Sequence, residues 1–263
     1  MSNERTGKVL FVATALCVVC SVLVSTAALG LRPLQEENAV KEIKRNILSA
    51  AGMLPESGTY DLDQLFAEME TSVIELKTGE VAQGIDPKTF DPAEAEKVAA
   101  TTFNVPAAKL AKVGIRSHAT RMKVYVKRSA SGGVETVVLP IHGKGLWSTM
   151  YAFLALESDL RTVKNLVFYK HAETPGLGGE VDNPLWRAQW PGKQLFDEQS
   201  NYDFKILKGR VQPGSAKAKQ QADGLSGATI TTNGVNGTIE YWMGPEGYGP
   251  FLQKLREQGA RRG

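Results

Sequence analysis

A stretch of 23 residues without a charged side chain, residues 9–31, limits most strongly what this chain can form. As a helix rising about 1.5 Å per residue, it would span roughly 34 Å, enough to cross the hydrocarbon core of a bilayer. We therefore predict a transmembrane helix at residues 9–31. A cleaved signal peptide is the alternative, because the small residues 25–28 could suit a signal peptidase. Its apolar region, however, is usually only about 7–15 residues long.

The overall composition excludes several classes of function. The 263 residues include 31 Lys and Arg against 28 Asp and Glu, and no run of Lys or Arg exceeds two residues, so a nucleic-acid interface is not indicated. The two cysteines, Cys17 and Cys20, cannot build a disulfide framework or a four-thiolate metal site, and we interpret them as apolar residues of the anchor. His118, His142 and His171 are too scattered for a helical metal-ligand pair, so no metal site is predicted.

The segments after the anchor predict an α+β fold: a mixed, mostly antiparallel sheet domain with flanking helices. A helix is expected at residues 35–53, and Asp61 and Asp91 are expected as helix N-caps, the second with Pro92 at the first helical position and Glu94 completing a capping box. Apolar and β-branched runs predict the strands, with a Ser/Gly hairpin turn at 129–133. The predicted strands are residues 73–81, 122–128, 134–141 and 163–170.

Three glycine-rich segments are candidates for a site: residues 143–147 (GKGLW), 171–180 (HAETPGLGGE) and 223–232 (DGLSGATITT). The first two follow predicted strands and could be simple turns; the second leads to a helix start at Asn183-Pro184. Neither matches a nucleotide-binding fingerprint. The third precedes a predicted helix at 234–243 and places a hydroxyl at a helix N-terminus, where free N–H groups and the helix dipole favour a phosphate.

The segment 223–229 (DGLSGAT) resembles the recognition motif for covalent flavinylation, in which a flavin transferase joins the phosphate of FMN to the last threonine, here Thr229. The anchor, GKGLW, HAETPGLGGE and WRAQWPGK (residues 186–193) extend this resemblance over nearly the whole chain. Together they are similar to the FMN-binding-domain family that forms the C subunit of Na+-translocating NADH:quinone reductases.

The resemblance implies an electron-carrier subunit of a membrane complex whose other members are the A, B, D, E and F subunits. Electrons from NADH would reach a covalently bound FMN through a membrane iron–sulfur centre, pass to a flavin in the B subunit and end on ubiquinone, coupled to ion transport. It also implies a cytoplasmic tail (1–8), the transmembrane helix (9–31), a connector and N-terminal part of the exported domain (32–112) and a periplasmic FMN-binding domain (113–263) at the bacterial inner membrane. No independent turnover and no nucleic-acid partner are expected.

The expected cofactor site combines the three glycine-rich segments. Thr229 would carry the covalent FMN, whose ring would lie in a pocket where glycines allow close approach, leucines cover the ring and polar groups bond its edge. The residues assigned to this site are Thr229, Asp223, Ser226, Gly227, Ala228, Gly145, Leu146, Trp147, Glu173, Thr174, Gly176 and Leu177.

Several alternatives remain open from the sequence. The G subunit of an Rnf-type electron-transfer complex shares the anchor, an ETPGLG-like loop and the SGAT segment. A membrane-tethered module that binds a free anion is the alternative outside redox chemistry. Thr231 and Thr232 are further hydroxyls near the predicted attachment site, and Lys144 is expected to be a solvated surface lysine more than a partner of the flavin.

Overall fold

The structure, a computed structural model, describes residues 3–55 and 57–260. The chain divides into two compact units, Met1–Ile43 and Lys44–Gly263. Helix α1 (Asn3–Ala50) begins in the first unit and ends in the second. Among the described residues it is the one helix that is long and apolar enough to cross a membrane, with a window of mean hydropathy 2.5 of which nothing is buried. This agrees with the predicted apolar anchor.

The second predicted helix, at residues 35–53, is not a separate element. It is the continuation of α1, which runs through Pro33 without a break and ends at Ala50. A proline inside a helix removes one N–H donor and disfavours the helix locally, but the helical residues continue on both sides of Pro33. The anchor and the helix predicted at residues 35–53 are therefore one helix in the structure.

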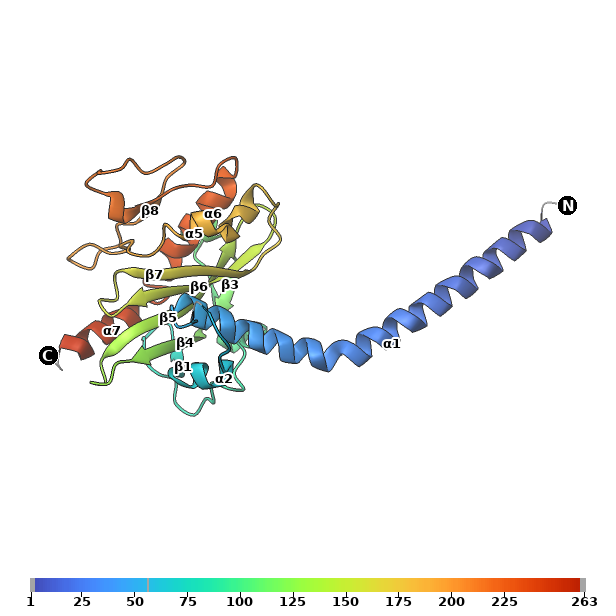
Figure 1. Cartoon of the computed structure of the whole chain (residues 1–263), viewed down its shortest axis with the longest axis horizontal. Coiled ribbons are helices and arrows are strands. Elements are labelled where there is room, and N and C mark those ends of the chain that lie inside the picture. The colour runs from blue at the N-terminus through green and yellow to red at the C-terminus, as the bar shows by residue number, and fades with distance from the viewer. Residues whose placement is uncertain (1–2, 56, 261–263) are drawn as a thin grey trace. The chain divides into compact units, whose positions relative to one another are not determined.

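The second unit is built on an antiparallel sheet with the strand order β1-β4-β5-β6-β7, formed within the described part of the chain (Figure 1). In sheet order the strands are Met69–Glu75 (β1), Arg121–Arg128 (β4), Val134–Lys144 (β5), Thr149–Glu157 (β6) and Val163–Lys170 (β7). The predicted hairpin is β4–β5 and the predicted strand at 163–170 is β7. Both are confirmed.

Both faces of the sheet are covered. Helices α6 (Thr229–Trp242) and α7 (Gly249–Ala260) contribute Trp242 and Leu252 to the large apolar core on one face. On the other face the last turns of α1 are held by the side-chain amide of Asn165, which donates to the carbonyl oxygen of Ser49 at 3.3 Å. The central strands are consequently shielded from water on both sides.

This double coverage explains why strand β6 was missed from the sequence. Five consecutive residues, 152–156, are buried, so β6 is an apolar run without the alternation typical of a half-exposed strand. Strand β1 was predicted with the wrong bounds. It begins at Met69 and ends at Glu75, because the chain turns at Gly79 (φ +70°) and only Val81 returns to pair with Ile74.

The other elements of the described residues are short, and two of their caps were predicted. Asp61 and Asp91 accept hydrogen bonds from backbone N–H groups of α2 and α3, which confirms both as N-caps. Glu94, expected to complete a capping box, instead pairs with Lys97 at 2.6 Å. The short elements are α2 (Leu62–Ala67), α3 (Pro92–Glu96), η1 (Ala99–Thr101), β2 (Thr102–Asn104), α4 (Ala107–Val113), β3 (Ser117–Ala119), η2 (Gly178–Asp182), α5 (Pro184–Arg187), β8 (Lys205–Ile206), η3 (Ala218–Gln220) and β9 (Gln221–Ala222).

Helix α6 lies unusually close to the end of β5. A Cβ atom added at Gly234 would lie 2.2 Å from the carbonyl oxygen of Lys144, and one added at Gly237 would lie 2.2 Å from that of Lys112 in α4. No side chain fits at these contacts. The two glycines therefore fix where α6, and with it the DGLSGAT segment, lies against the sheet.

Two of the three histidines belong to an aromatic cluster in the core. The buried His118 contacts the carbonyl oxygen of Ala119 through Nδ1 and the hydroxyl of Tyr241 through Nε2, both at 2.8 Å. Since a carbonyl only accepts, Nδ1 carries the proton and Tyr241 donates to Nε2. His142 stacks on Tyr151. Burial, and to a smaller extent His118, lowers the pKa of His142 to about 4.

Stability should fall as the pH drops below about 6.5. There an unfolded histidine takes up a proton, whereas folded His142 does so only near pH 4. Across that window we expect the free energy of unfolding to decrease by up to about 3 kcal/mol on account of this group. Denaturant unfolding of the detergent-solubilised chain, followed by tryptophan fluorescence between pH 7 and 5, measures the slope. His142→Gln should reduce it, and an unchanged slope would contradict the assignment.

Gly234→Ala should destabilise the fold by about 1–3 kcal/mol, because the new methyl group must displace the carbonyl of Lys144. The matched control is Gly209→Ala, since a Cβ added there meets nothing within 4 Å. Thermal unfolding of the two variants beside the unaltered chain provides the comparison. Equal unfolding temperatures for both variants would show that α6 can move away from β5.

Candidate functional site

The DGLSGAT segment leads directly into the N-terminus of α6, as predicted, but the helix begins at Thr229 and not at Gly234. Gly227 adopts φ +73°, a left-handed conformation that favours glycine, and α6 begins two residues later at Thr229. Ala228 is the N-cap and makes no side-chain capping bond, while the first helical bond runs from Thr232 N to its carbonyl oxygen at 2.9 Å. The preceding amides of the first turn thus have no acceptor within the helix, an arrangement that favours an anion.

The three threonine hydroxyls of this segment differ in their surroundings. Thr231 is buried and donates to Glu173 Oε2 at 2.7 Å. Thr232 is also buried, and its hydroxyl accepts from the backbone N–H of Leu225 at 3.0 Å. Thr229 is exposed, and in the described part of the chain its hydroxyl makes no hydrogen bond. Among the three, only the hydroxyl of Thr229 is free to react or to bind.

Glu173 joins the three glycine-rich segments. Its side chain, 5% exposed, accepts the backbone N–H groups of Leu146 at 3.1 Å, Trp147 at 2.9 Å and Ser148 at 3.0 Å, all in the turn between β5 and β6. The hydroxyl of Thr231 in α6 completes the set. From the sequence, Glu173 was expected to hydrogen-bond to the polar edge of the flavin ring. In the structure, both oxygens of its carboxylate accept hydrogen bonds from other residues of the chain.

The Glu173 carboxyl is ionised well below neutral pH. Burial by itself would raise its pKa, but the hydrogen bonds from Thr231 and from three backbone N–H groups outweigh burial and lower the pKa below its usual value. The charge is therefore retained in the interior and is neutralised by donors from separate segments.

Asp223, the first residue of the motif, holds the loop in place. Its carboxylate accepts the backbone N–H of Val211 at 2.7 Å. Its own carbonyl accepts from the indole of Trp186 at 2.9 Å, and its N–H donates to the side chain of Gln189. Trp186 and Gln189 belong to the WRAQW segment, which begins in α5. This segment therefore holds the backbone of the first residue of the motif.

Large apolar side chains are exposed on the segments that Glu173 joins. Leu146 and Trp147 on the β5–β6 turn are 42% and 69% exposed, and Leu177 in the second loop is 44% exposed. Leu177 reaches the motif, because a Cβ added at Gly227 would lie 3.1 Å from its Cδ2 atom. Next to Thr229, Ile230 is 58% exposed. Ile230 was not predicted as a site residue, although an apolar residue beside the motif threonine was a signal for it.

The other expected site residues lie in the same loops. Gly145 is buried beside Glu173, where a Cβ would approach the carboxylate to within 2.6 Å. Thr174 and Gly176 are exposed, and the carbonyl of Thr174 accepts the N–H of Leu177 at 3.1 Å. Ser226 is exposed and Ala228 buried in the turn before α6. Lys144 is a strand residue with an exposed side chain, so GKGLW begins within β5 and is not wholly a loop.

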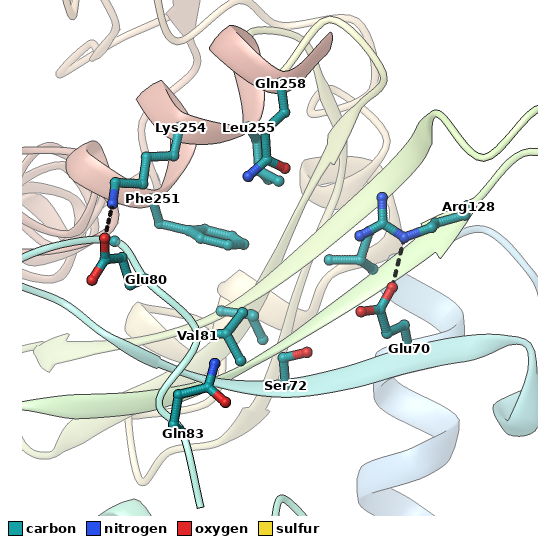
Figure 2. Close-up of a pocket in the computed structure, with 13 residues that line it drawn as sticks. Glu70, Ser72, Glu80, Val81, Gln83, Arg128, Phe251, Lys254, Leu255 and Gln258 are labelled. Atoms are coloured by element: carbon teal, nitrogen blue, oxygen red, sulfur yellow. Dashed lines mark hydrogen bonds and ion pairs between the residues drawn. The ribbon is translucent and has the colours of Figure 1, made fainter. Parts of the chain in front are cut away.

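A hollow of about 500 Å³ adjoins the site. It lies between α4 and α6 and is lined by Lys144, Gly145 and Ile230. The groove in Figure 2 is separate, between α7 and the β1–β4 edge of the sheet, and none of the expected site residues lines it. Ion pairs between Lys254 and Glu80 and between Arg128 and Glu70 lie along it.

Comparison with known proteins gives a consistent result. Residues 145–244 match the family described as FMN-binding domain. The chain is 43% identical over 265 residues to the C subunit of the Na(+)-translocating NADH-quinone reductase of Yersinia pestis, covering all of this chain and 97% of that protein. To the same subunit of Vibrio anguillarum it is 44% identical over 259 residues, covering 98% of each.

Two solved structures share the fold. The crystal structure of Shewanella oneidensis NqrC has a TM-score of 0.74 and 35% identity, covering 83% of this chain and 99% of that chain. The C subunit of the Na(+)-translocating NADH-quinone reductase from Parabacteroides distasonis has a TM-score of 0.61 and 25% identity, covering 84% of this chain and 96% of that chain.

The burial of the three hydroxyls predicts different stabilities for their variants. Thr231→Val leaves a charged acceptor without its donor, and Thr232→Val leaves the N–H of Leu225 unpaired, so each should cost about 1–3 kcal/mol. Thr229→Ala removes no hydrogen bond and should change stability by less than about 0.5 kcal/mol. Denaturant titration of the three variants ranks them, and a loss at Thr229 as large as at Thr231 would refute this description.

Proposed function

Because the chain belongs to the family of the C subunit of the Na+-translocating NADH-quinone reductase, an oxidoreductase complex, we propose that it carries FMN joined through its phosphate to Thr229. The Yersinia and Vibrio relatives reported above, which match over nearly the full length, are C subunits of this reductase, and this favours it over the Rnf-type alternative. The observation that carries the proposal is the free, exposed hydroxyl of Thr229 at an uncapped helix N-terminus.

The chemistry of the site suits a phosphate ester. Oγ1 of Thr229 would bond to the phosphorus on the flavin side of a diphosphate substrate, the P–O bond to the second phosphate would break, and that phosphate half would leave while the hydroxyl proton passes to a base of the transferase. The negative charge of the diester would lie near the free N–H groups at the start of α6, which stabilise an anion there. Thr231 and Thr232 are buried and bonded and could not be reached without disturbing the helix.

The exposed apolar side chains of these segments suit the flavin ring. Leu146, Trp147, Leu177 and Ile230 expose apolar surface that a planar aromatic ring would cover, and Gly176 and Gly227 are exposed in the adjoining loops. When bound, FMN supplies the electron-transfer chemistry, and the protein holds it, orients it and controls its contact with water. A phosphate tether retains the cofactor without a new bond to the ring.

Within the complex we assign this protein the role of an electron carrier. It would receive electrons from a membrane iron–sulfur centre and pass them to a flavin of the B subunit, on the route from NADH to ubiquinone that is coupled to ion transport. The anchor would hold the domain at the periplasmic face of the inner membrane with the N-terminus in the cytoplasm. The domain has no cysteine after the anchor, so its redox chemistry would depend on the flavin.

Flavin attachment can be tested directly in a denaturing gel. The full chain co-expressed with a flavin transferase should give a fluorescent band that survives denaturation, because the ester is covalent. Thr229→Ala should abolish this fluorescence. Thr59→Ala, an exposed threonine outside the site, is the matched control and should keep it.

The possible results separate the candidate functions. No fluorescence from the unaltered chain would refute the redox carrier and favour the tethered anion-binding module. Fluorescence that survives Thr229→Ala would place the attachment on another hydroxyl. Mass spectrometry of the tryptic peptide that contains residues 223–232 would locate it.

A further inference from the structure

We propose that Glu173 is the positioning residue of the flavin site: its carboxylate holds the β5–β6 turn and the first turn of α6 in the one arrangement that accepts the cofactor. This inference rests on the proposed function. It assigns a role to a residue that lies outside the DGLSGAT motif. Glu173 lies 56 residues before Thr229 in the chain and contributes no atom to the attachment itself.

The carboxylate bridges segments that are distant in sequence. Oε1 accepts the N–H groups of Trp147 and Ser148, which precede Glu173 by 26 and 25 residues. Oε2 accepts the N–H of Leu146 on one side and the hydroxyl of Thr231, 58 residues after Glu173, on the other. One side chain thus links two elements of the site that share no strand pairing.

These bonds fix the backbone directly beneath the side chains that would contact FMN. Leu146 and Trp147 donate their backbone N–H groups to Glu173, and their side chains are exposed. Thr231 is two residues after Thr229 and holds the first turn of α6 from its buried side. The carboxylate therefore sets the separation between the attachment hydroxyl and the apolar residues of the turn.

Two glycines pack closely against the carboxylate of Glu173. A Cβ added at Gly145 or at Gly178 would lie 2.6 Å from a carboxylate oxygen. Its backbone is also held, because its N–H donates to His171 Nδ1 at 3.2 Å and His171 Nε2 contacts Asp182 at 2.7 Å. Neither the chain nor the side chain of Glu173 has room to shift.

An amide cannot replace the carboxylate in this setting. The groups facing Glu173 are all donors, and each of its oxygens accepts at least two hydrogen bonds. Glutamine has the same shape but presents an NH₂ group, which would meet N–H or O–H groups in place of one oxygen. Glu173→Gln therefore breaks half of the bridge while keeping its volume.

The test follows the rate of flavin attachment and the state of the attached flavin. The full chain and its Glu173→Gln variant are incubated with flavin transferase and its flavin substrate, and covalent fluorescence is measured over time. We expect attachment to Glu173→Gln to be slower by about 10²-fold, the effect typical of a misplaced reacting group. Flavin that does attach should have a shifted absorption spectrum and midpoint potential, which a loss of stability alone would not produce.

Asp159 provides a matched control. Its carboxylate also holds a turn, accepting the N–H groups of Arg161 at 2.9 Å and Thr162 at 2.8 Å and the hydroxyl of Thr162 at 2.6 Å. That turn lies at the opposite end of β6, roughly 30 Å from the β5–β6 turn. Asp159→Asn should lower stability and leave the attachment rate, the spectrum and the potential unchanged.

A second pair of variants keeps the test decisive if Glu173→Gln does not fold. Thr231→Ser retains the donor to Glu173 and Thr231→Val removes it. The positioning role requires slower attachment and a shifted flavin spectrum in Thr231→Val, with both restored in Thr231→Ser. Attachment at the unaltered rate with an unchanged spectrum in Glu173→Gln or Thr231→Val would overturn the positioning role alone. Absence of flavin from the unaltered chain would overturn the proposed function with it.

Discussion

The buried carboxylate of Glu173 is the interaction on which the rest of the site depends. An ionised group in the interior is stable only when donors surround it, and here the donors come from a strand turn and a helix. Folding must bring these segments together to neutralise the charge. The same bonds join the turn that carries the exposed Leu146 and Trp147 to the first turn of α6, which begins at Thr229, so one electrostatic constraint brings these segments together.

Close backbone packing supplies the second constraint. Gly234 lets α6 approach the end of β5 without an intervening side chain, while Trp186 and Gln189 hold the backbone of Asp223 from the other side. Thr229 therefore sits on a rigid helix end and the loop before it is bonded in place. A cofactor tethered by its phosphate needs such support, because the tether alone would not fix the orientation of a ring.

The two units of the chain differ in character: the first holds most of the apolar helix, and the second holds the sheet domain with the candidate site. The apolar helix α1 fits the membrane anchor of a subunit of a bacterial respiratory complex, and both cysteines lie in that helix. The sheet domain offers a site on its loops, which a scaffold buried on both faces holds still. The redox chemistry proposed for this protein thus depends on how these loops are positioned.

The sequence by itself determined the features that depend on neighbouring residues: the apolar anchor, the β4–β5 hairpin, β7, and the helix start after the DGLSGAT segment. Residue type and spacing suffice for these. Only the tertiary structure decided the bounds of β1, the existence of β6 and the hydrogen-bond partners of Glu173. The apolar run of β6 does not show which layers cover it, and the partners of Glu173 lie 25 to 58 residues away, so no local pattern records them.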